Sequence, residues 1–349
     1  MRMIKPSAKK ALLSLIALIL TLCMLSSVLV SCTPLHPISK TSFDWFDTVT
    51  TVSAYMSQKE FDKMWETLSE RLDYYHKLFD IYNEYSGMNN LCSVNKNAGK
   101  SALTVDRELV DFISYALEIY EITDKKVNIA MGSLLRVWHE YREAGIGDPE
   151  NASLPSEALL EEKAAKCDIS AVKLDREKCE IYISDEEVSL DVGALAKGYA
   201  VEKAAAELKA LGYSGIIISA GGNICTVGSK PSGEKWAVGI SDPNGGSSYP
   251  AIAEISDASL VTSGSYQRYY TVGTERYHHI IDPETYMPAN YFVSVTVMAD
   301  SSALADAMST ALFISDLESG KKMCEELGIE AFWIYADGKT EMTDGFPAK

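Results

Sequence analysis

Helix-like and strand-like segments follow one another without regular alternation, and this order constrains the fold most. Residues 58–80 and 105–122 carry apolar side chains three and four positions apart, which predicts amphipathic helices. Further helices are expected at 155–166, 194–211, 302–315 and 318–327. Strands are expected at 46–56, 174–183, 187–191, 216–219, 236–240, 251–255, 267–271, 293–298 and 332–335, and a polar loop at 83–100. Because a doubly wound sheet needs alternating strands and helices, we expect an α+β fold with mixed or antiparallel sheets and packed helices.

The first 31 residues have the composition of an export signal. Four basic residues precede the uncharged stretch 11–30, and Leu-Val-Ser stands directly before Cys32. This pattern indicates a bacterial lipoprotein signal that is cut before Cys32, which then carries the lipid. A retained anchor helix is the alternative, because the stretch is long enough to span a bilayer. Either interpretation predicts an extracytoplasmic body anchored to the cell membrane, with 32–42 as a tether of low order and 43–345 as one folded domain.

Charge and cysteine content exclude several classes of function. The chain has 49 acidic and 32 basic residues, a net charge of −17, and the leader removes four more positive charges when it leaves. A body this acidic repels phosphate backbones, which argues against nucleic-acid binding. A phosphorylated ligand would need a local device such as a metal ion. The five cysteines after Cys32 include no Cys-x-x-Cys pair, which indicates neither a disulfide framework nor a zinc site.

The densest motif is the segment Ser-Leu-Asp-Val-Gly-Ala-Leu-Ala-Lys-Gly-Tyr at 189–199. Its small residues lie where an expected strand passes into a helix, and free backbone N–H groups there can meet an anion. Lys197 in the first helical turn fits a phosphate partner better than it fits the helix dipole. Asp191 could bond a polar ligand or cap the helix. An ordinary glycine turn before a helix explains the segment equally well when it is taken alone.

Two further motifs could carry chemistry. His278 and His279 precede Asp-Pro, and neighbours in an extended segment face opposite sides, so only one imidazole can face a site and act as a base. The other interpretation is a structural histidine. Asp306 and Thr310 are four residues apart on an expected helix, so both oxygens lie on one face, as Mg²⁺ coordination requires. A solvated helix face would show the same spacing.

Together these motifs resemble the ApbE family, the FAD:protein FMN transferases. The resemblance covers about residues 43–340, through the blocks LDVGALAKGYAVEKAAAEL, SAGGNI, SGSYQRYY, RYHHIIDP and SVTVMADSSALADAMSTALF. It implies an ApbE-like fold, a Mg²⁺ site at Ala194 (backbone carbonyl), Asp306 and Thr310 with Ser309 as a neighbour, and His279 as the base with Lys197 assisting. The flavin contacts that it implies are Phe46, Tyr82, Val127, Asn128, Asp191, Lys197 and Ile281.

The resemblance also implies the reaction and its partners. FMN would pass from FAD to a Ser/Thr hydroxyl of an exported acceptor protein that carries a flavinylation motif, and AMP would leave. Two alternatives stay open: a Mg²⁺-dependent FAD pyrophosphatase that yields FMN and AMP, and a non-catalytic FAD-binding lipoprotein.

The chain departs from the family pattern at several positions. Phe46-Asp47 replaces Met-Gly, Asn128 and Ser265 each replace an aspartate, and Tyr286-Met287 replaces a glycine-bearing turn. Reduced activity or an altered acceptor preference would follow if these positions matter.

Overall fold

A computed structural model describes residues 36–246 and 249–349. The predicted signal peptide 1–31, the predicted lipid attachment at Cys32 and the start of the tether lie outside the described residues. Within the described ranges, no helix combines the length and the apolar character that crossing a membrane requires.

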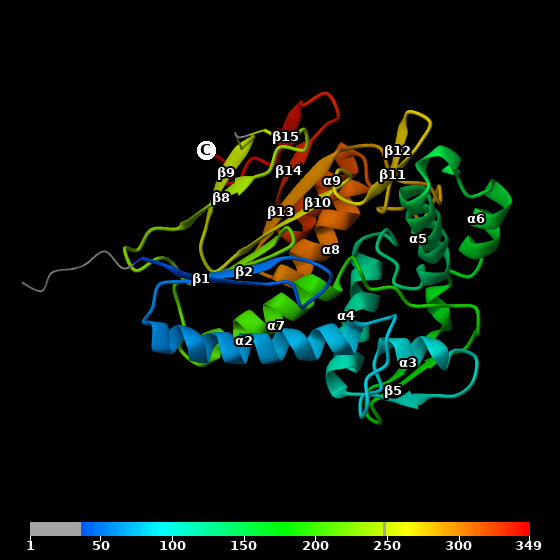
Figure 1. Cartoon of the computed structure of the whole chain (residues 1–349), viewed down its shortest axis with the longest axis horizontal. Helices are drawn as coiled ribbons and strands as arrows, with labels where there is room; N and C mark the ends of the chain where they lie inside the picture. The colour runs from blue at the N-terminus through cyan, green and yellow to red at the C-terminus, as the bar shows by residue number, and fades with distance from the viewer. Residues whose placement is uncertain (1–35, 247–248) are drawn as a thin grey trace, which may run out of the picture. The chain divides into compact units, whose positions relative to one another are not determined.

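The centre of the fold is an eight-stranded sheet in which every neighbouring pair is antiparallel (Figure 1). In spatial order its strands are β1 (Ile38–Ser42), β2 (Thr50–Ala54), β6 (Ile216–Ala220), β7 (Asn223–Val227), β10 (Ser259–Gly264), β13 (Ser294–Ala299), β14 (Glu330–Ile334) and β15 (Thr340–Met342). The antiparallel sheet and its packed helices confirm the predicted α+β fold.

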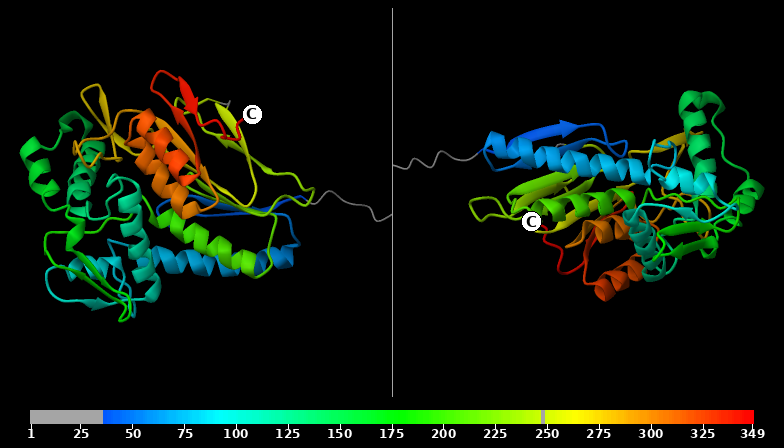
Figure 2. Two further views of the ribbon diagram at one scale, coloured as in Figure 1. Left: turned by 180° about the vertical axis from the view of Figure 1, so that it is seen from behind. Right: turned by 90° about the horizontal axis from the view of Figure 1, so that it is seen from below.

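Helices cover one face of this sheet. Helix α8 (Ser302–Phe313) packs against β10, β13 and α7 (Ala196–Ala210), and α2 (Gln58–Phe79) packs against α7. Both views of Figure 2 show α2 and α7 running alongside each other. Helix α8 is buried on almost every side, which explains why small and apolar residues occupy all of its faces and why it lacks the charged stripe of an amphipathic surface helix. The predicted site residues on α7 and α8 therefore have a rigid support.

The other face is covered by a hairpin. Strands β8 (Trp236–Ile240) and β9 (Ala251–Ile255) pair with each other and bury their alternate residues. The buried side chains of the hairpin form an apolar cluster with Leu260 of β10 and Phe332 of β14. The residues next to Leu260 and Phe332 in the sequence face the helices instead. Side chains alternate across a strand, so β10 and β14 contribute to both cores.

The remaining elements surround the helical side. They are α3 (Leu91–Lys96), α4 (Arg107–Ile122), α5 (Gly132–Gly147), α6 (Glu157–Ala164) and α9 (Leu317–Leu327), the short helices η1 (Pro149–Asn151) and η2 (Ile169–Ala171), the three-stranded sheet β3 (Leu103–Thr104), β5 (Glu180–Ile183), β4 (Val172–Asp175), and the hairpin β11 (Tyr269–Val272), β12 (Glu275–His278). Helix α5 contacts β11 and α6, and these elements share a third apolar cluster. This cluster forms one side of the site described below.

Five sequence expectations are wrong in detail. The single strand expected at 174–183 is a hairpin of β4 and β5, in which Asp175 pairs with Glu180. Residues 38–42 are not a loose tether, because they form β1 and pair along their length with β2. The strand expected at 46–56 is confined to Thr50–Ala54, because Phe46 and Asp47 have φ angles of +55° and +48° and form a turn. The segment 83–100 contains α3. Residues 187–191 make a single bridge, between Ser189 and Met131, rather than a strand.

Helix α5 has no counterpart among the expected helices. It begins and ends with glycine, and its N-cap residue Met131 makes no side-chain capping bond. The usual start signals are therefore missing, and tertiary packing supplies the stability.

Candidate active site

One cavity of about 530 Å³ collects the residues that the family resemblance singled out. Its walls come from the α2–α3 loop, α5, the segment before α7, β10, the β11–β12 hairpin and α8. The lining residues include Phe46, Tyr82, Val127, Asn128, Asp191, Ala194, Lys197, His279, Ile281, Asp306 and Thr310. Positions far apart in the sequence thus meet at one place, while the role of each remains a prediction.

The charge of the cavity differs from that of the whole chain. Four acidic residues line it (Asp47, Asp80, Asp191, Asp306) and four basic ones (Lys126, Arg142, Lys197, Arg268), against a net charge of −17 for the chain. A phosphate group therefore meets locally balanced charge, although the molecule as a whole repels it.

Asp306 on α8 caps the first turn of α7. Its Oδ2 accepts the Gly198 N–H at 2.6 Å and its Oδ1 lies 3.1 Å from Lys197 Nζ. The N-cap residue Leu195 provides no side-chain cap, so Asp306 satisfies an N–H that would otherwise lack a partner. The carboxylate is only 6% exposed. Lys197 is therefore held at the helix start by an ion pair, not by the helix dipole.

Gly198 permits this close approach of the two helices. A Cβ atom at this position would lie 2.4 Å from the Cβ of Asp306 and 2.5 Å from the Ser302 carbonyl oxygen. Any side chain there would push α8 away and break the cap.

The other predicted metal ligands lie beside Asp306. Thr310 follows one turn later and lines the cavity, as does Ala194, which precedes the N-cap of α7 and so stands outside the hydrogen-bond ladder of that helix. Ser309 is fully buried instead, and its hydroxyl contacts Ser263 Oγ at 2.8 Å and the Asp306 carbonyl at 2.9 Å. Ser309 thus supports α8 from behind.

Asp191 lies in the segment that leads into α7. Its N–H donates to the Ile129 carbonyl at 2.8 Å, and its Oδ1 accepts the Gly193 N–H at 2.9 Å. Part of its surface faces the cavity, but the enclosing protein walls raise the pKa of the carboxyl, with the Gly193 bond opposing. The preceding residue is fixed by Asn95 of α3, whose amide bonds both the N–H (2.7 Å) and the carbonyl (2.9 Å) of Leu190.

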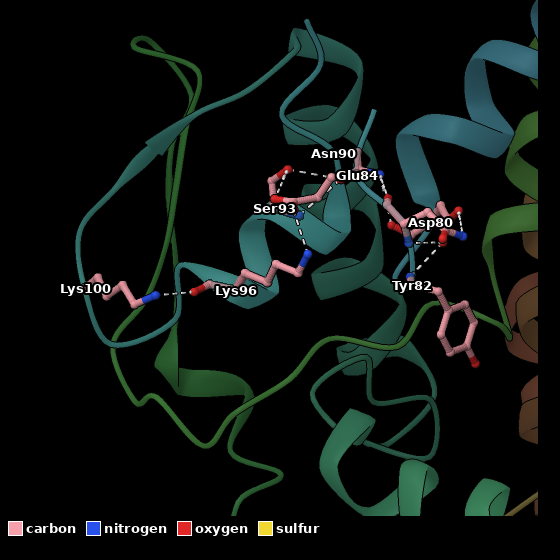
Figure 3. A network of polar contacts seen from close by, with 8 residues as sticks. Asp80, Tyr82, Glu84, Asn90, Ser93, Lys96 and Lys100 are labelled. Atoms are coloured by element: carbon pink, nitrogen blue, oxygen red, sulfur yellow. Dashed lines mark hydrogen bonds and ion pairs between the residues drawn. The ribbon is translucent and has the colours of Figure 1, made fainter. Parts of the chain in front are cut away.

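Tyr82 reaches the cavity from the loop between α2 and α3. Its side chain is 64% exposed, so its position depends on its backbone. Asp80 Oδ1 accepts the Tyr82 and Asn83 N–H groups at 2.7 and 3.1 Å, while Oδ2 accepts the Tyr85 hydroxyl at 2.8 Å. Figure 3 shows the tyrosine ring pointing away from this network.

Asn90, the N-cap of α3, closes the same loop from within. It is fully buried, and its Oδ1 accepts the Ser93 N–H (Figure 3). Its Nδ2 donates to the carbonyls of Lys77 (2.9 Å) and Asn83 (2.7 Å). A loop that the sequence suggested to be irregular is therefore tightly bonded.

The two adjacent histidines face opposite sides, as predicted. His278 is buried against Phe313; its Nε2–H donates to the Ala289 carbonyl at 2.7 Å and its Nδ1 accepts the Ile280 N–H. His279 lines the cavity, and its Nδ1 lies 3.2 Å from the Arg268 carbonyl. A carbonyl only accepts, so Nδ1 carries the proton and Nε2 keeps a free lone pair. Burial, with the Arg268 charge adding to it, lowers the pKa of His279 to about 3, which keeps the imidazole neutral.

The turn at Phe46 depends on a distant glycine. Phe46 N–H donates to His76 Nδ1 at 3.2 Å, which anchors the turn. Gly221 has φ +51°, and a Cβ there would lie 1.8 Å from Thr48 Oγ1. Two residues with positive φ replace the Met-Gly of the family pattern, so the turn survives at the cost of some backbone strain.

The other departures also have local partners. Asn128 Oδ1 accepts the Ala130 N–H at 2.8 Å and its Nδ2 donates to the Cys167 carbonyl at 2.9 Å, a bond that an aspartate cannot make. Ser265 bonds to the Val293 carbonyl. Tyr286 has φ +62°, where the family pattern carries glycine. These residues fit the surrounding backbone and leave the cavity open.

Sequence reasoning missed several lining residues, among them Arg142, His139, Trp138, Lys126 and Arg268. Trp138, His139 and Arg142 lie in α5, and Lys126 lies in the segment before it. Because α5 was not expected as a helix, the sequence did not indicate which of these side chains face the cavity. Arg268 stands in the block SGSYQRYY, but spacing alone does not distinguish it from other arginines of the hairpin.

Three oxygen donors of the cavity fit a hard cation such as Mg²⁺: the Asp306 carboxylate, the Thr310 hydroxyl and the Ala194 carbonyl. Among residues 36–246 and 249–349, no three His, Cys, Asp or Glu side chains come together as a metal cluster. A metal at Asp306 would therefore rely on a single carboxylate, and Lys197 would have to release Oδ1.

Comparisons with known proteins agree with this geometry. The model of the ApbE family matches residues 46–333. The FAD:protein FMN transferase of Treponema pallidum is 32% identical over 271 residues (73% of each chain), and that of Escherichia coli K12 is 27% identical over 289 residues (80% of each).

Solved structures give the same result. The ApbE protein of Thermotoga maritima superimposes with a TM-score of 0.79 at 26% identity, covering 90% of this chain and all of that one. The flavin transferase ApbE of Vibrio cholerae, at 21% identity, shares the fold, with a TM-score of 0.74 over 89% of this chain and 97% of that one.

Proposed function

The chain belongs to the ApbE family, and from this premise we propose that it transfers FMN from FAD to a hydroxyl group of an exported acceptor protein. The observation that carries the proposal is the convergence of eleven family-assigned positions on one cavity. The curated relatives that match over most of their length are FAD:protein FMN transferases, so this chain is a transferase rather than a pyrophosphatase or a passive flavin binder.

His279 supplies the base for this reaction. With Nδ1–H bonded to the Arg268 carbonyl, Nε2 is free to take the proton of an acceptor Ser or Thr hydroxyl. The hydroxyl oxygen then forms a bond to the FMN phosphorus, and the bond from that phosphorus to the bridging oxygen breaks. AMP leaves with the bridging oxygen and its electron pair. A positioned base of this kind contributes about 10²- to 10⁴-fold in rate.

Lys197 and the start of α7 stabilise the negative charge that develops on the phosphates. Ala194, Asp306 and Thr310 would hold Mg²⁺, which supplies charge neutralisation for the pyrophosphate. Because Asp306 also bonds Gly198 and Lys197, the same carboxylate sets the distance between the cation site and the helix start.

We further propose that the body is exported and anchored through a lipid on Cys32. Support comes from the basic leader, the uncharged stretch and the residues before Cys32. Metabolic labelling with a palmitate analogue, compared between wild type and Cys32→Ser, tests this assignment.

The test of the reaction uses the chain from Thr33, FAD, Mg²⁺ and a peptide that bears a flavinylation-type threonine. Intact-mass analysis should show a peptide gain equal to FMN, absent with EDTA. FMN and AMP with unmodified peptide in every acceptor tried would establish the hydrolase instead. FAD that stays bound and intact would leave only a binding protein.

A further inference from the structure

Arg268 differs from the other cations of the cavity. Three of the four basic residues that line it form ion pairs: Lys126 with Glu284 at 2.7 Å, Lys197 with Asp306 at 3.1 Å, and Arg142 with Glu143 at 3.2 Å. No ion pair of the described part of the chain includes Arg268, and its side chain is exposed. In an acidic protein, this guanidinium keeps its charge available for a ligand.

The backbone holds Arg268 beside the proposed base. Its carbonyl oxygen accepts the His279 N–H at 3.2 Å and lies at the same distance from Nδ1 of the imidazole. Both residues line the cavity, so they belong to one wall. The backbone of Arg268 and the imidazole of His279 cannot move apart without breaking these bonds beside the β11–β12 hairpin.

We propose that Arg268 binds a phosphate group of the flavin dinucleotide next to His279 and thereby couples substrate binding to the basicity of the imidazole. The inference rests on the proposed function, because it specifies how that site takes its substrate. A guanidinium presents a planar pair of donors that matches two phosphate oxygens, which an ammonium cannot do.

Electrostatics supports the coupling. Burial is the main cause that lowers the pKa of His279, followed by the positive charge of Arg268. The charges of His278 in β12 and Arg142 in α5 act on the pKa of His279 in the same direction. A phosphate on Arg268 would compensate its charge, and the pKa of His279 would rise. The free enzyme thus keeps a weak base, and the substrate complex acquires a stronger one.

Three variants of the full-length chain in detergent test the proposal: Arg268→Gln, Arg268→Lys and the control Arg276→Gln. Arg276 lies in the same hairpin, but its guanidinium packs over the Tyr269 ring at 4.7 Å from the centroid. FAD affinity is measured by quenching of flavin fluorescence, transfer rates are measured between pH 3 and pH 9, a range that includes the pKa of His279, and melting temperatures at each pH verify folding.

Arg268→Gln should weaken FAD binding by about ten- to hundred-fold, the effect of one charge-assisted pair. It should also shift the acidic limb of kcat/KM to higher pH, because His279 loses a positive neighbour. Arg268→Lys should weaken binding but leave that limb in place, because the charge remains. Arg276→Gln should change neither quantity.

The proposal is wrong if Arg268→Gln binds FAD and responds to pH as Arg276→Gln does. If Arg268 had a purely structural role, both variants would have lower melting temperatures. The acidic limb of the kcat/KM profile would then not distinguish Arg268→Gln, which loses the charge, from Arg268→Lys, which keeps it. If wild type transfers no FMN, the proposed reaction fails, and the fluorescence measurement still decides whether Arg268 binds the dinucleotide.

Discussion

Replacing Asp306 by alanine and by asparagine separates its two roles. In Asp306→Ala the buried Gly198 N–H loses its acceptor, which costs about 1–3 kcal/mol. Lys197 also loses its partner, but it can turn into the cavity and regain solvent, so this adds little. We therefore expect a loss of about 1–3 kcal/mol in unfolding free energy. At roughly 2 °C per kcal/mol for a large domain, the melting temperature should fall by about 2–6 °C.

Asp306→Asn keeps an amide oxygen for Gly198 and should lose about 1 kcal/mol or less. It removes the negative charge, so FMN transfer should fall by at least about 10²-fold in both variants. Differential scanning fluorimetry gives the stabilities, and intact-mass rates give the transfer. Glu207→Gln is the matched control, because it removes a carboxylate that pairs with Arg71 on the exposed side of α7. Transfer at the wild-type rate by Asp306→Asn would refute the requirement for a carboxylate.

Three further predictions concern the other walls of the cavity. Asp80→Ala should raise the dissociation constant of FAD about tenfold by freeing Tyr82, with no additional loss in a Tyr82→Ala background; additive losses would contradict this link. The pKa of His279 is about 3 in the folded chain and about 6.5 in the unfolded chain. As the pH drops, the imidazole is therefore protonated first in the unfolded chain, and the free energy of unfolding falls between pH 6.5 and pH 3. His279→Gln should therefore show a smaller drop in urea midpoint between pH 7 and pH 5 than wild type. Gly221→Ala should lose about 2–4 kcal/mol through its contact with Thr48 and its positive φ, and Thr48→Ala should restore only the contact part, as urea midpoints of the single and double variants would show.

Periodicity predicted the elements whose burial follows a local pattern. Helix α2 buries one stripe of side chains along its length, and the sequence placed it within one residue of its observed end. Helix α3 could not be found in this way, because six residues carry no period and Asn90 joins it to backbone that precedes it by up to 13 residues. The bridge at Ser189 likewise depends on Met131, far away in the sequence.

In the candidate site too, local sequence patterns identified some features, and others depend on contacts between distant segments. Asp306 and Lys197 stand in long motif blocks, so the family resemblance identified both as site residues. The contact between them could not be predicted, because it depends on how α7 packs on α8. Arg268 and Arg276 cannot be told apart from the sequence, because both are arginines followed by a tyrosine. Only the folded hairpin shows that one faces the cavity and the other packs on a tyrosine ring.

Helix α3 has a consequence for how the site opens. Its Asn90 holds the loop of Tyr82, and its Asn95 holds the backbone directly before Asp191. Two walls of the cavity are therefore tied to one short helix, and neither can unfold locally without disturbing the other. Amide hydrogen exchange should report one shared opening free energy for both segments, and bound FAD should slow exchange in both to the same degree.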